Sequence, residues 1–343
     1  MTTRGSTSWI IAGVAAVVLT GVLSVSIGPV SINPLDVFAE LIDHLPFISW
    51  DSGLPQARRA IVWDVRAPRV VLSLMVGALL SGSGAAYQGV FRNPLASPYL
   101  LGVAAGAGLG VTLMIVYGIS DGVGPFDPVP AAAFIGALLA VSAAGILGTK
   151  VGTAGSSATL ILAGIAVTSF LTAAQTYVQQ RNADTLRQVY VWILGRLEGS
   201  WDSVLLILPY AVVCLAILVW MAGALDVLAV GDDEAATLGL NPKRVRRIVL
   251  VFASLAAAAA VSVSGLIGFV GLVVPHAVRQ LAGVGNRRVI PLSILFGAAF
   301  LALADIAART LQSPAELPIG VVTAFVGAPF FLLILRSQSG RTT

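Results

Sequence analysis

Long runs of uncharged, mostly apolar residues alternate with short charged segments along this chain of 343 residues. Most of these runs reach or approach the roughly 20 residues that a helix needs to cross the hydrocarbon core of a bilayer. No strand-like alternation of apolar and polar residues recurs along the chain, which argues against a membrane β-barrel. The uncharged runs cover 5–35, 70–91, 93–120, 128–149, 151–180, 203–225, 248–278, 289–304 and 317–335.

These runs predict ten membrane-spanning helices. The run 248–278 is too long for one span and is interrupted by glycines at Gly265–Gly271, so we expect it to form two helices, the second of them short. The pattern from Pro34 onward predicts a short amphipathic helix at the membrane surface, and another short helix is expected around Tyr190–Leu197. The other expected spans are 8–28, 66–89, 99–117, 130–149, 157–180, 203–222, 289–309 and 317–335; the divided run gives one beginning near 248 and one ending near 282.

Composition supports the same fold class, because 57% of the residues are hydrophobic and only 10% are charged, against about 25% charged in soluble domains. We therefore predict an all-α integral membrane protein with a single transmembrane domain over 1–343. It has a polar outer connection at about 29–64 and a cytoplasmic loop at about 226–247. The one cysteine, Cys214, lies in an apolar run and is expected to pack in the interior. The first apolar run lacks a small-residue cleavage site, so we interpret it as a retained helix.

The distribution of charge predicts the orientation, because cytoplasmic segments of membrane proteins carry an excess of Lys and Arg. With the N-terminus in the cytoplasm, the inner segments hold eleven of the 20 Lys and Arg and only four of the 16 acidic residues. Both termini are therefore expected inside. The inner basic residues are Arg4, Arg92, Lys150, Lys243, Arg244, Arg246, Arg247, Arg287, Arg288, Arg336 and Arg341.

Eight arginines remain on the predicted outer side, which topology alone does not explain. They cannot be binding the anionic inner leaflet. Two interpretations stay open: they pair locally with outer acidic residues, or they dock an acidic partner. These residues are Arg58, Arg59, Arg66, Arg69, Arg181, Arg187, Arg196 and Arg309.

Few residues offer chemistry of their own. No Gly-Lys pair occurs, which excludes an ATP-binding P-loop, and the HExxH, CxxC and GxSxG motifs are absent. His44 and His276 lie far apart, and a structural hydrogen bond is the favoured role for His276. Charges inside the spans would mark an ion-coupled pathway, but only Asp305 and Arg309 come close, near an outer helix end. A proton-coupled carrier is therefore disfavoured, and the energy for transport has to come from another subunit.

The segment 231–247 is suited to receiving that energy. It has an acidic helical start at Asp232, Asp233 and Glu234, a Leu238–Leu240 break, and then a basic helix entry. A short amphipathic helix here would fit a groove of an ATPase. The residues alone leave this interpretation level with an ordinary loop that obeys the positive-inside rule.

Long, ordered motifs decide between these interpretations. The first half contains Arg66-Ala-Pro-Arg69, Val76-Gly-Ala-Leu-Leu, Gln88, Arg92-Asn-Pro-Leu-Ala-Ser-Pro98 and Leu101-Gly102-Val. The second half contains Leu238-Gly239-Leu240, Gly265-Leu-Ile-Gly-Phe-Val-Gly-Leu-Val-Val-Pro-His276, Arg279, Ala304-Asp305, Ala308-Arg309, Glu316-Leu-Pro-Ile-Gly-Val-Val-Thr323 and Gly327-Ala-Pro329. Over roughly 60–335, the chain resembles the FecCD family, the permeases of type II ABC importers for iron complexes and vitamin B12.

The resemblance implies a homodimer of ten-helix subunits, two cytoplasmic ATPase subunits that hold ATP and Mg, and an extracytoplasmic substrate-binding protein. The chain itself would hold no cofactor, metal or catalytic residue, and would contact membrane lipid but no nucleic acid. Three groups of site residues are implied. Docking of the binding protein falls on Arg66, Arg69 and Arg309; coupling to the ATPase on Asp232, Asp233, Glu234, Thr237, Leu238, Gly239 and Leu240; and the translocation gate on Ser156, Ser157 and Ala158.

The gate assignment departs from the family pattern, because the vitamin B12 permease has a Thr-Ser pair where this chain has Ser157-Ala158. The resemblance predicts a multi-pass permease of the bacterial cytoplasmic (inner) membrane that imports an iron complex through the homodimer interface. A ferric siderophore is the favoured substrate, with haem and cobalamin as close alternatives. The contrasting hypothesis is a secondary carrier or channel that works alone.

Overall fold

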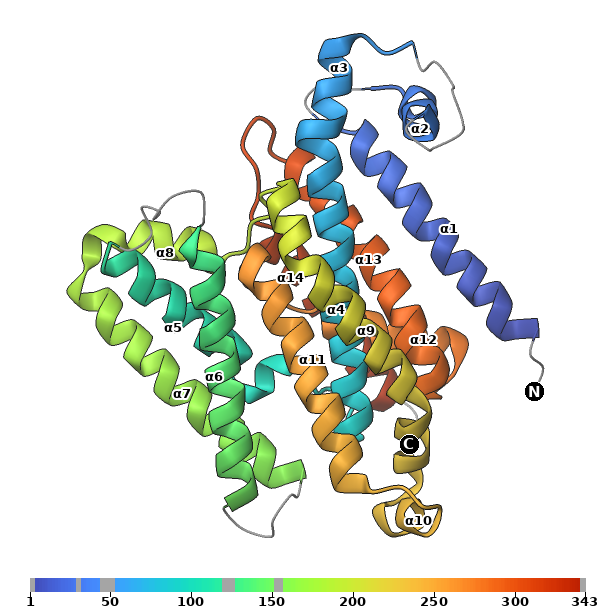
Figure 1. The fold of residues 1–343 in the computed structure, drawn as a ribbon, viewed down its shortest axis with the longest axis vertical. Coiled ribbons are helices and arrows are strands. Elements are labelled where there is room, and N and C mark those ends of the chain that lie inside the picture. Colours follow the sequence, from blue (N-terminus) through green and yellow to red (C-terminus); the bar gives the residue numbers. More distant parts are fainter. Residues whose placement is uncertain (1–3, 29–31, 44–52, 119–126, 151–156, 340–343) are drawn as a thin grey trace.

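The computed structural model describes residues 4–28, 32–43, 53–118, 127–150 and 157–339, and every regular element in these ranges is a helix (Figure 1). The elements are α1 (Arg4–Ser26), α2 (Pro34–Asp43), α3 (Gln56–Ala60), η1 (Ile61–Arg66), α4 (Ala67–Phe91), η2 (Pro98–Leu101), α5 (Val103–Val116), α6 (Pro128–Lys150), α7 (Ser157–Arg181), η4 (Ala183–Thr185), α8 (Leu186–Ile193), α9 (Trp201–Val230), α10 (Asp232–Thr237), α11 (Pro242–Ser264), α12 (Val270–Ala282), α13 (Asn286–Thr310) and α14 (Ile319–Ser339).

Ten of these helices match the predicted spans, which confirms the all-α membrane fold. Seven of them are long and apolar enough to cross a bilayer, and α5 and α14 are shorter apolar helices. The tenth, α12, has 13 residues, as expected for the second half of a divided apolar run. Figure 1 shows α5, α6 and α7 grouped on one side of the molecule, with α4, α9, α11 and α13 packed together beside them.

The helix α4 forms the centre of this second group. Together with α3 and η1 it makes one continuous helix from Gln56 to Phe91, which is 36 residues long. In its most apolar stretch of 18 residues, 83% of the residues are buried. The predicted span began at Arg66, so the true helix extends outward through a stretch predicted to be connection. Its π-helical section, Ile61–Arg66, lies just before Pro68. Proline cannot donate the helical hydrogen bond and its ring crowds the preceding turn, so a widened turn there lets the helix continue.

Glycines let α4 approach its neighbours at the level of the backbone. A Cβ atom added at Gly84 would overlap the carbonyl of Gly271 in α12, and one added at Gly77 would overlap the carbonyl of Gly297 in α13. Because lipid tails are as apolar as the side chains, helices in a membrane associate through such close packing rather than through hydrophobic burial. These two contacts fix α12 and α13 against α4.

Helix ends predicted to lie on the inner side also differ from the predicted boundaries. The helix α9 continues to Val230, where the prediction ended it at 222, and α11 begins at Pro242 rather than near Ile248. Asn241 caps α11, since its side chain accepts a hydrogen bond of 3.0 Å from the backbone N–H of Arg244. The predicted spans were taken from uncharged runs, and such runs end at the first charged residue. Both helices continue past that point, since α9 includes Asp226 and α11 begins with several basic residues.

The predicted break between the two halves of the divided run is confirmed. The helix α11 ends at Ser264 and α12 starts at Val270, with Phe269 in the left-handed region at φ 67°. The backbone at this break has partners from other segments: the hydroxyl of Tyr99 in η2 donates to the carbonyl of Ile267 at 2.8 Å, and the N–H of Arg196 donates to the carbonyl of Ser264, the last residue of α11, at 2.9 Å. Non-helical backbone at membrane depth is tolerated because protein groups satisfy it.

The α4–α12 contact makes a stability prediction. Gly84→Ala should lower the free energy of unfolding by about 1–3 kcal/mol, because the new methyl group overpacks the contact with Gly271. The matched control is Gly145→Ala in α6, where an added Cβ meets no atom within 4 Å. Both changes gain the same helix propensity. The measurement is the thermal unfolding midpoint in detergent, and equal midpoints for the two variants would contradict the packing argument.

Candidate functional site

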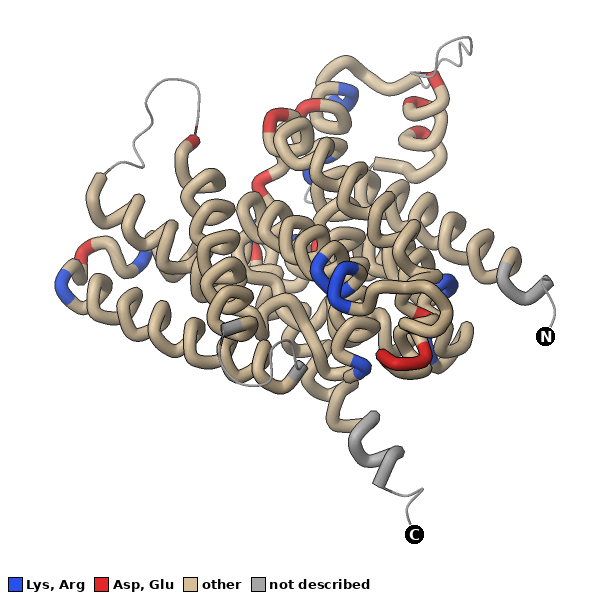
Figure 2. The backbone as a smooth tube through the Cα atoms, turned by 60° about the horizontal axis from the view of Figure 1, so that its bottom comes forward, with Lys and Arg blue, Asp and Glu red and all other residues tan. Residues whose placement is uncertain are grey.

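Charged residues gather at helix ends and connecting loops, while long stretches of the described helices carry none (Figure 2). Two clusters lie at opposite ends of α4. Named by the predicted orientation, the outer cluster is formed by Arg69, Asp305 and Glu316, and the inner cluster by Arg92, Asp232 and Arg246. Burying charge in a bilayer is costly, so a spanning helix concentrates its polar contacts at its two ends. These ends are where such a protein can meet water-soluble partners.

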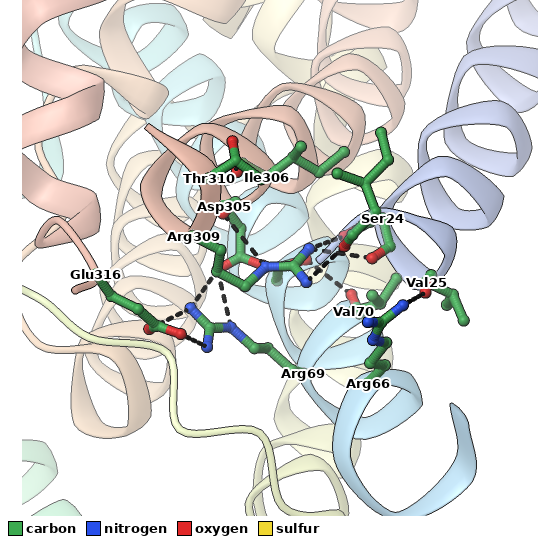
Figure 3. A network of polar contacts seen from close by, with 12 residues as sticks. Ser24, Val25, Arg66, Arg69, Val70, Asp305, Ile306, Arg309, Thr310 and Glu316 are labelled. Atoms are coloured by element: carbon green, nitrogen blue, oxygen red, sulfur yellow. Dashed lines mark hydrogen bonds and ion pairs between the residues drawn. The ribbon is translucent and has the colours of Figure 1, made fainter. Parts of the chain in front are cut away.

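In the outer cluster, Arg69 of α4 connects two carboxylates (Figure 3). Its guanidinium lies 2.9 Å from Asp305 of α13 and donates two parallel hydrogen bonds of 3.0 Å to Glu316 in the α13–α14 loop. Partial burial acts to raise the pKa of Glu316, but the bonds from Arg69 act in the opposite direction and outweigh it. The pKa of Glu316 therefore lies below its usual value. The pair therefore remains charged at neutral pH. Its paired geometry is the strong form of an Arg–carboxylate contact.

Two other outer arginines hold the end of α1. The guanidinium of Arg309 pairs with Asp305 at 2.9 Å and donates to the carbonyls of Ser24 at 3.0 Å and Ile27 at 3.1 Å. Arg66 donates to the carbonyls of Val25 at 2.7 Å and Ser26 at 3.1 Å. The last carbonyls of a helix lack partners within the helix and carry its negative dipole end. Both arginines thus satisfy groups that α1 leaves open.

The three predicted docking residues are brought together, but they differ in exposure. Arg66 and Arg309 are buried, with only 5% and 6% of their surface exposed, whereas 18% of the Arg69 side chain is exposed. Arg69 also borders an open cavity of about 340 Å³ with Arg196 and Glu316. Docking of a partner remains a prediction, and of the three residues Arg69 is the one that faces outward. That Arg66 and Arg309 cap α1 could not be foreseen, since backbone carbonyls leave no sequence signature.

In the inner cluster, the predicted coupling residues form one short surface element. The helix α10 begins at Asp232, with Asp233 and Glu234 exposed in its first turn. It ends at Thr237, whose hydroxyl donates to the Glu234 carbonyl at 2.8 Å. Next comes Leu238, whose side chain is 69% exposed.

The chain then turns at Gly239, at φ 84°. This is a left-handed backbone position that favours glycine at a helix C-terminus. Its N–H donates to the carbonyl of Ala236 at 3.0 Å, and that of Leu240 donates to Ala235 at 3.0 Å. The turn leaves the apolar side chain of Leu238 exposed directly after α10.

Asp232 has two partners that sequence reasoning missed. Arg246 of α11 donates two hydrogen bonds of 2.6 Å to its carboxylate, and Arg92 at the end of α4 donates one of 2.6 Å. Neighbouring Asp226, at the end of α9, accepts bonds from the backbone N–H groups of Asn286 and Arg287 at the start of α13. The sequence did contain one signal for these contacts. Asp226 and Asp232 are acidic residues in a segment predicted to be rich in Lys and Arg, so basic side chains could have been expected within reach of their carboxylates.

The other residues singled out in the sequence make fewer contacts in the part of the chain that the structure describes. Ser156 lies outside the described residues, Ser157 begins α7, and Ala158 is exposed in its first turn, so the gate stays a prediction. Cys214 is buried, as expected. A ring nitrogen of His276 lies 3.0 Å from the side-chain nitrogen of Gln280. Within the described ranges, no three His, Cys, Asp or Glu residues come together in a way that could hold a metal ion.

Known proteins match this fold over nearly its whole length. A solved structure, described as a candidate metal-chelate type ABC transporter in an inward-facing conformation, superposes with a TM-score of 0.82. It shares 28% sequence identity and the match covers 96% of this chain and 98% of that one. Because the match covers almost all of both chains, it shows that this chain has the type II ABC importer permease fold.

Curated relatives agree. A cobalamin import system permease protein from Halobacterium salinarum is 42% identical, over 84% of this chain and 77% of the relative. A hemin transport system permease protein from Yersinia pestis is 40% identical, over 85% of this chain and 88% of the relative. An Fe(3+)-citrate import system permease protein from Bacillus subtilis is 34% identical, over 94% of this chain and 92% of the relative. The model of the FecCD transport family matches residues 16–337. This chain, with its membrane helices and two charged ends, is a member of the FecCD transport family.

Proposed function

We propose that this permease carries a ferric siderophore inward across the bacterial cytoplasmic membrane, with haem and cobalamin as the close alternatives. The coarser statement rests on family membership: the chain is the non-catalytic permease subunit of an ABC importer for iron chelates, haem or cobalamin. Support for an iron chelate comes from the Fe(3+)-citrate relative, which matches over the largest share of the chain among the three relatives compared. The observation that carries the importer function is the exposed α10 turn at the inner end of the bundle.

An ABC importer permease works with ATPase subunits and a substrate-binding protein. We propose that the ATPases meet α10 and that Leu238 fits an apolar groove on their surface, since it is a large apolar side chain held out by a tight turn. The exposed Asp233 and Glu234 beside it would make polar contacts around that groove. Both termini then lie in the cytoplasm, on the same side as α10 and the basic start of α11.

We further propose a homodimer with the substrate pathway between the two copies. Large apolar side chains stand exposed on α7 and α14, among them Phe170 and Phe325. A cavity of about 910 Å³ among α5, α6 and α7 is lined by apolar residues such as Leu109 and Phe170, and none of the described residues that line it is charged. Such walls bind weakly, and differences in affinity between the transporter's states then move the substrate. The proposed gate remains Ser156, Ser157 and Ala158, of which Ser157 begins α7.

Docking outside is assigned to the face around Arg66, Arg69 and Arg309. Arg69 is the proposed contact for an acidic side chain of the binding protein, because it is partly exposed and borders an open cavity. Arg66 and Arg309 support this face from beneath by holding α1 in place. Complementary charges at such an interface increase specificity and the rate of association.

The docking assignment predicts that Arg69→Glu weakens binding of the substrate-binding protein tenfold or more at low salt, with a smaller deficit at high salt because the charges are then screened. Surface plasmon resonance on permease in nanodiscs measures the affinity. The matched control is Arg181→Glu, the same charge change at the exposed outer end of α7. Equal affinities of the wild-type protein and Arg69→Glu at low salt would refute the assignment.

The coupling assignment predicts that Leu238→Glu reduces ATPase activity stimulated by loaded binding protein at least tenfold, because a carboxylate cannot enter an apolar groove without a large desolvation cost. Thermal unfolding should be unchanged, since Leu238 is exposed. Val284→Glu, at an 80% exposed position in the α12–α13 loop, is the control. Wild-type stimulation in Leu238→Glu would place the ATPase contact elsewhere.

The importer function predicts that purified permease in lipid vesicles moves substrate only when its ATPase, ATP and the binding protein are all present. Uptake of a labelled ferric siderophore, haem or cobalamin is measured in parallel. A ferric siderophore should be taken up at least tenfold faster than the other two. Uptake without the ATPase would instead support a secondary carrier or channel, and preference for haem or cobalamin would replace the siderophore assignment.

A further inference from the structure

The short helix α12 carries its three polar side chains on one face. His276, Arg279 and Gln280 are spaced three and four positions apart, which places them together on a helix surface. A ring nitrogen of His276 and the side-chain nitrogen of Gln280 lie 3.0 Å apart. Polar side chains in a membrane helix are unfavourable unless they find partners. For a cation such as Arg279, the suitable partner is an anion.

The guanidinium of Arg279 is instead held by a neutral amide, that of Gln88 in α4. Gln88 is only 3% exposed, and its side-chain N–H donates to the carbonyl of Gly271 at 3.3 Å. That carbonyl has no helical partner, because the residue four positions later is Pro275, which lacks an N–H. The amide oxygen of Gln88 therefore faces Arg279 and accepts a hydrogen bond from it. The cation is fixed in place by a group that does not balance its charge.

Arg279 still has hydrogen-bond donors to offer. A guanidinium carries five N–H groups, and in the described part of the chain only Nη1 of Arg279 is engaged, by Gln88. The ion pairs among the described residues do not include Arg279. Its Nε and Nη2 atoms are not enclosed by the protein. A partly buried cation without a counter-charge is unfavourable, so an anion from outside the chain would complete this site.

The depth of Arg279 favours a lipid over a dissolved anion. In the predicted orientation, α12 ends at the inner membrane surface, just before Gly283. Arg279 lies four positions earlier, about 6 Å deeper at 1.5 Å per residue. The headgroup layer of a leaflet is roughly 5–7 Å thick, so Arg279 reaches the level where phosphates meet the hydrocarbon. The neighbouring apolar Leu281 is 62% exposed. Figure 1 shows α12 on the side of the molecule where α1 lies, away from α7.

We propose that Arg279 binds the phosphate of an anionic phospholipid in the inner leaflet, with the exposed Gln280 as a second polar contact and Leu281 against the acyl chains. The free edge of the guanidinium, Nε and Nη2, can donate two parallel hydrogen bonds to phosphate oxygens. A zwitterionic lipid binds less well, because its own cation already balances its phosphate. A lipid that binds only the folded protein also stabilises it. The site depends neither on the imported substrate nor on the ATPase contact.

The first test measures lipid binding to the purified whole permease by native mass spectrometry. Phosphatidylglycerol and phosphatidylcholine with the same acyl chains are compared. The wild-type protein should bind phosphatidylglycerol about fivefold more tightly, the size expected from one basic residue near a membrane surface. Arg279→Gln should remove most of this preference, and Arg279→Lys should keep part of it. Arg288→Gln, which removes an exposed arginine at the start of α13, is the matched control and should keep the full preference.

An equal loss of preference in Arg279→Gln and Arg288→Gln would show a general attraction by basic residues and would overturn the site. So would a wild-type preference in Arg279→Gln.

Thermal unfolding in nanodiscs separates lipid binding from a folding defect. The wild-type midpoint should be several degrees higher in equal parts of phosphatidylcholine and phosphatidylglycerol than in phosphatidylcholine alone. Arg279→Gln should lack this rise, whatever its midpoint in phosphatidylcholine. Inorganic phosphate added to phosphatidylcholine nanodiscs should leave both midpoints unchanged. A rise with phosphate in the wild-type protein alone would assign the site to a soluble anion, and weaker ATPase association of Arg279→Gln in phosphatidylcholine would assign it to that partner; either result contradicts the proposal.

Discussion

Close backbone contact between α4 and its neighbours is the constraint on which the rest of the structure depends. A bilayer offers no water to hydrogen-bond the backbone and little hydrophobic gain for packing one apolar helix on another. Association therefore requires backbones to meet, and Gly77 and Gly84 allow α13 and α12 to do so. Once these contacts form, the side chains of α4 are almost entirely enclosed, and its ends are the parts left free for polar interactions.

Function follows from this division between an apolar interior and charged ends. The spans can form a weakly binding wall for a bulky substrate, because they contain few charges. We propose that recognition and energy input belong to the two charged ends of α4, where Arg69 and Asp232 lie. An enzyme gathers its polar groups in one cleft, whereas this permease has to separate them by the thickness of the membrane. The polar contacts at both ends consequently belong to the same few helices.

The sequence was sufficient for the number of helices and for the break near Gly265, because both depend on apolar runs and on glycine spacing. It failed at helix ends such as Gln56 and Pro242, since a helix continues into water where an apolar run does not. Resemblance predicted the site residues but not their contacts. Arg309 bonds to carbonyls of α1, and Arg92 to a carboxylate far along the chain, and neither partner is marked by a local pattern.

The capping of α1 has a consequence for how the protein is made. Arg309 donates to Ser24, a residue 285 positions earlier in the chain. Arg66, which follows α1 closely in the chain, binds the carbonyls of Val25 and Ser26, so this part of the cap can form as soon as α4 is made. The carbonyls of Ser24 and Ile27 receive their bonds only when α13 brings Arg309. The end of α1 is therefore capped by arginines that enter the chain at very different times. A chain that stops before α13 keeps the contacts of Arg66 and lacks those of Arg309.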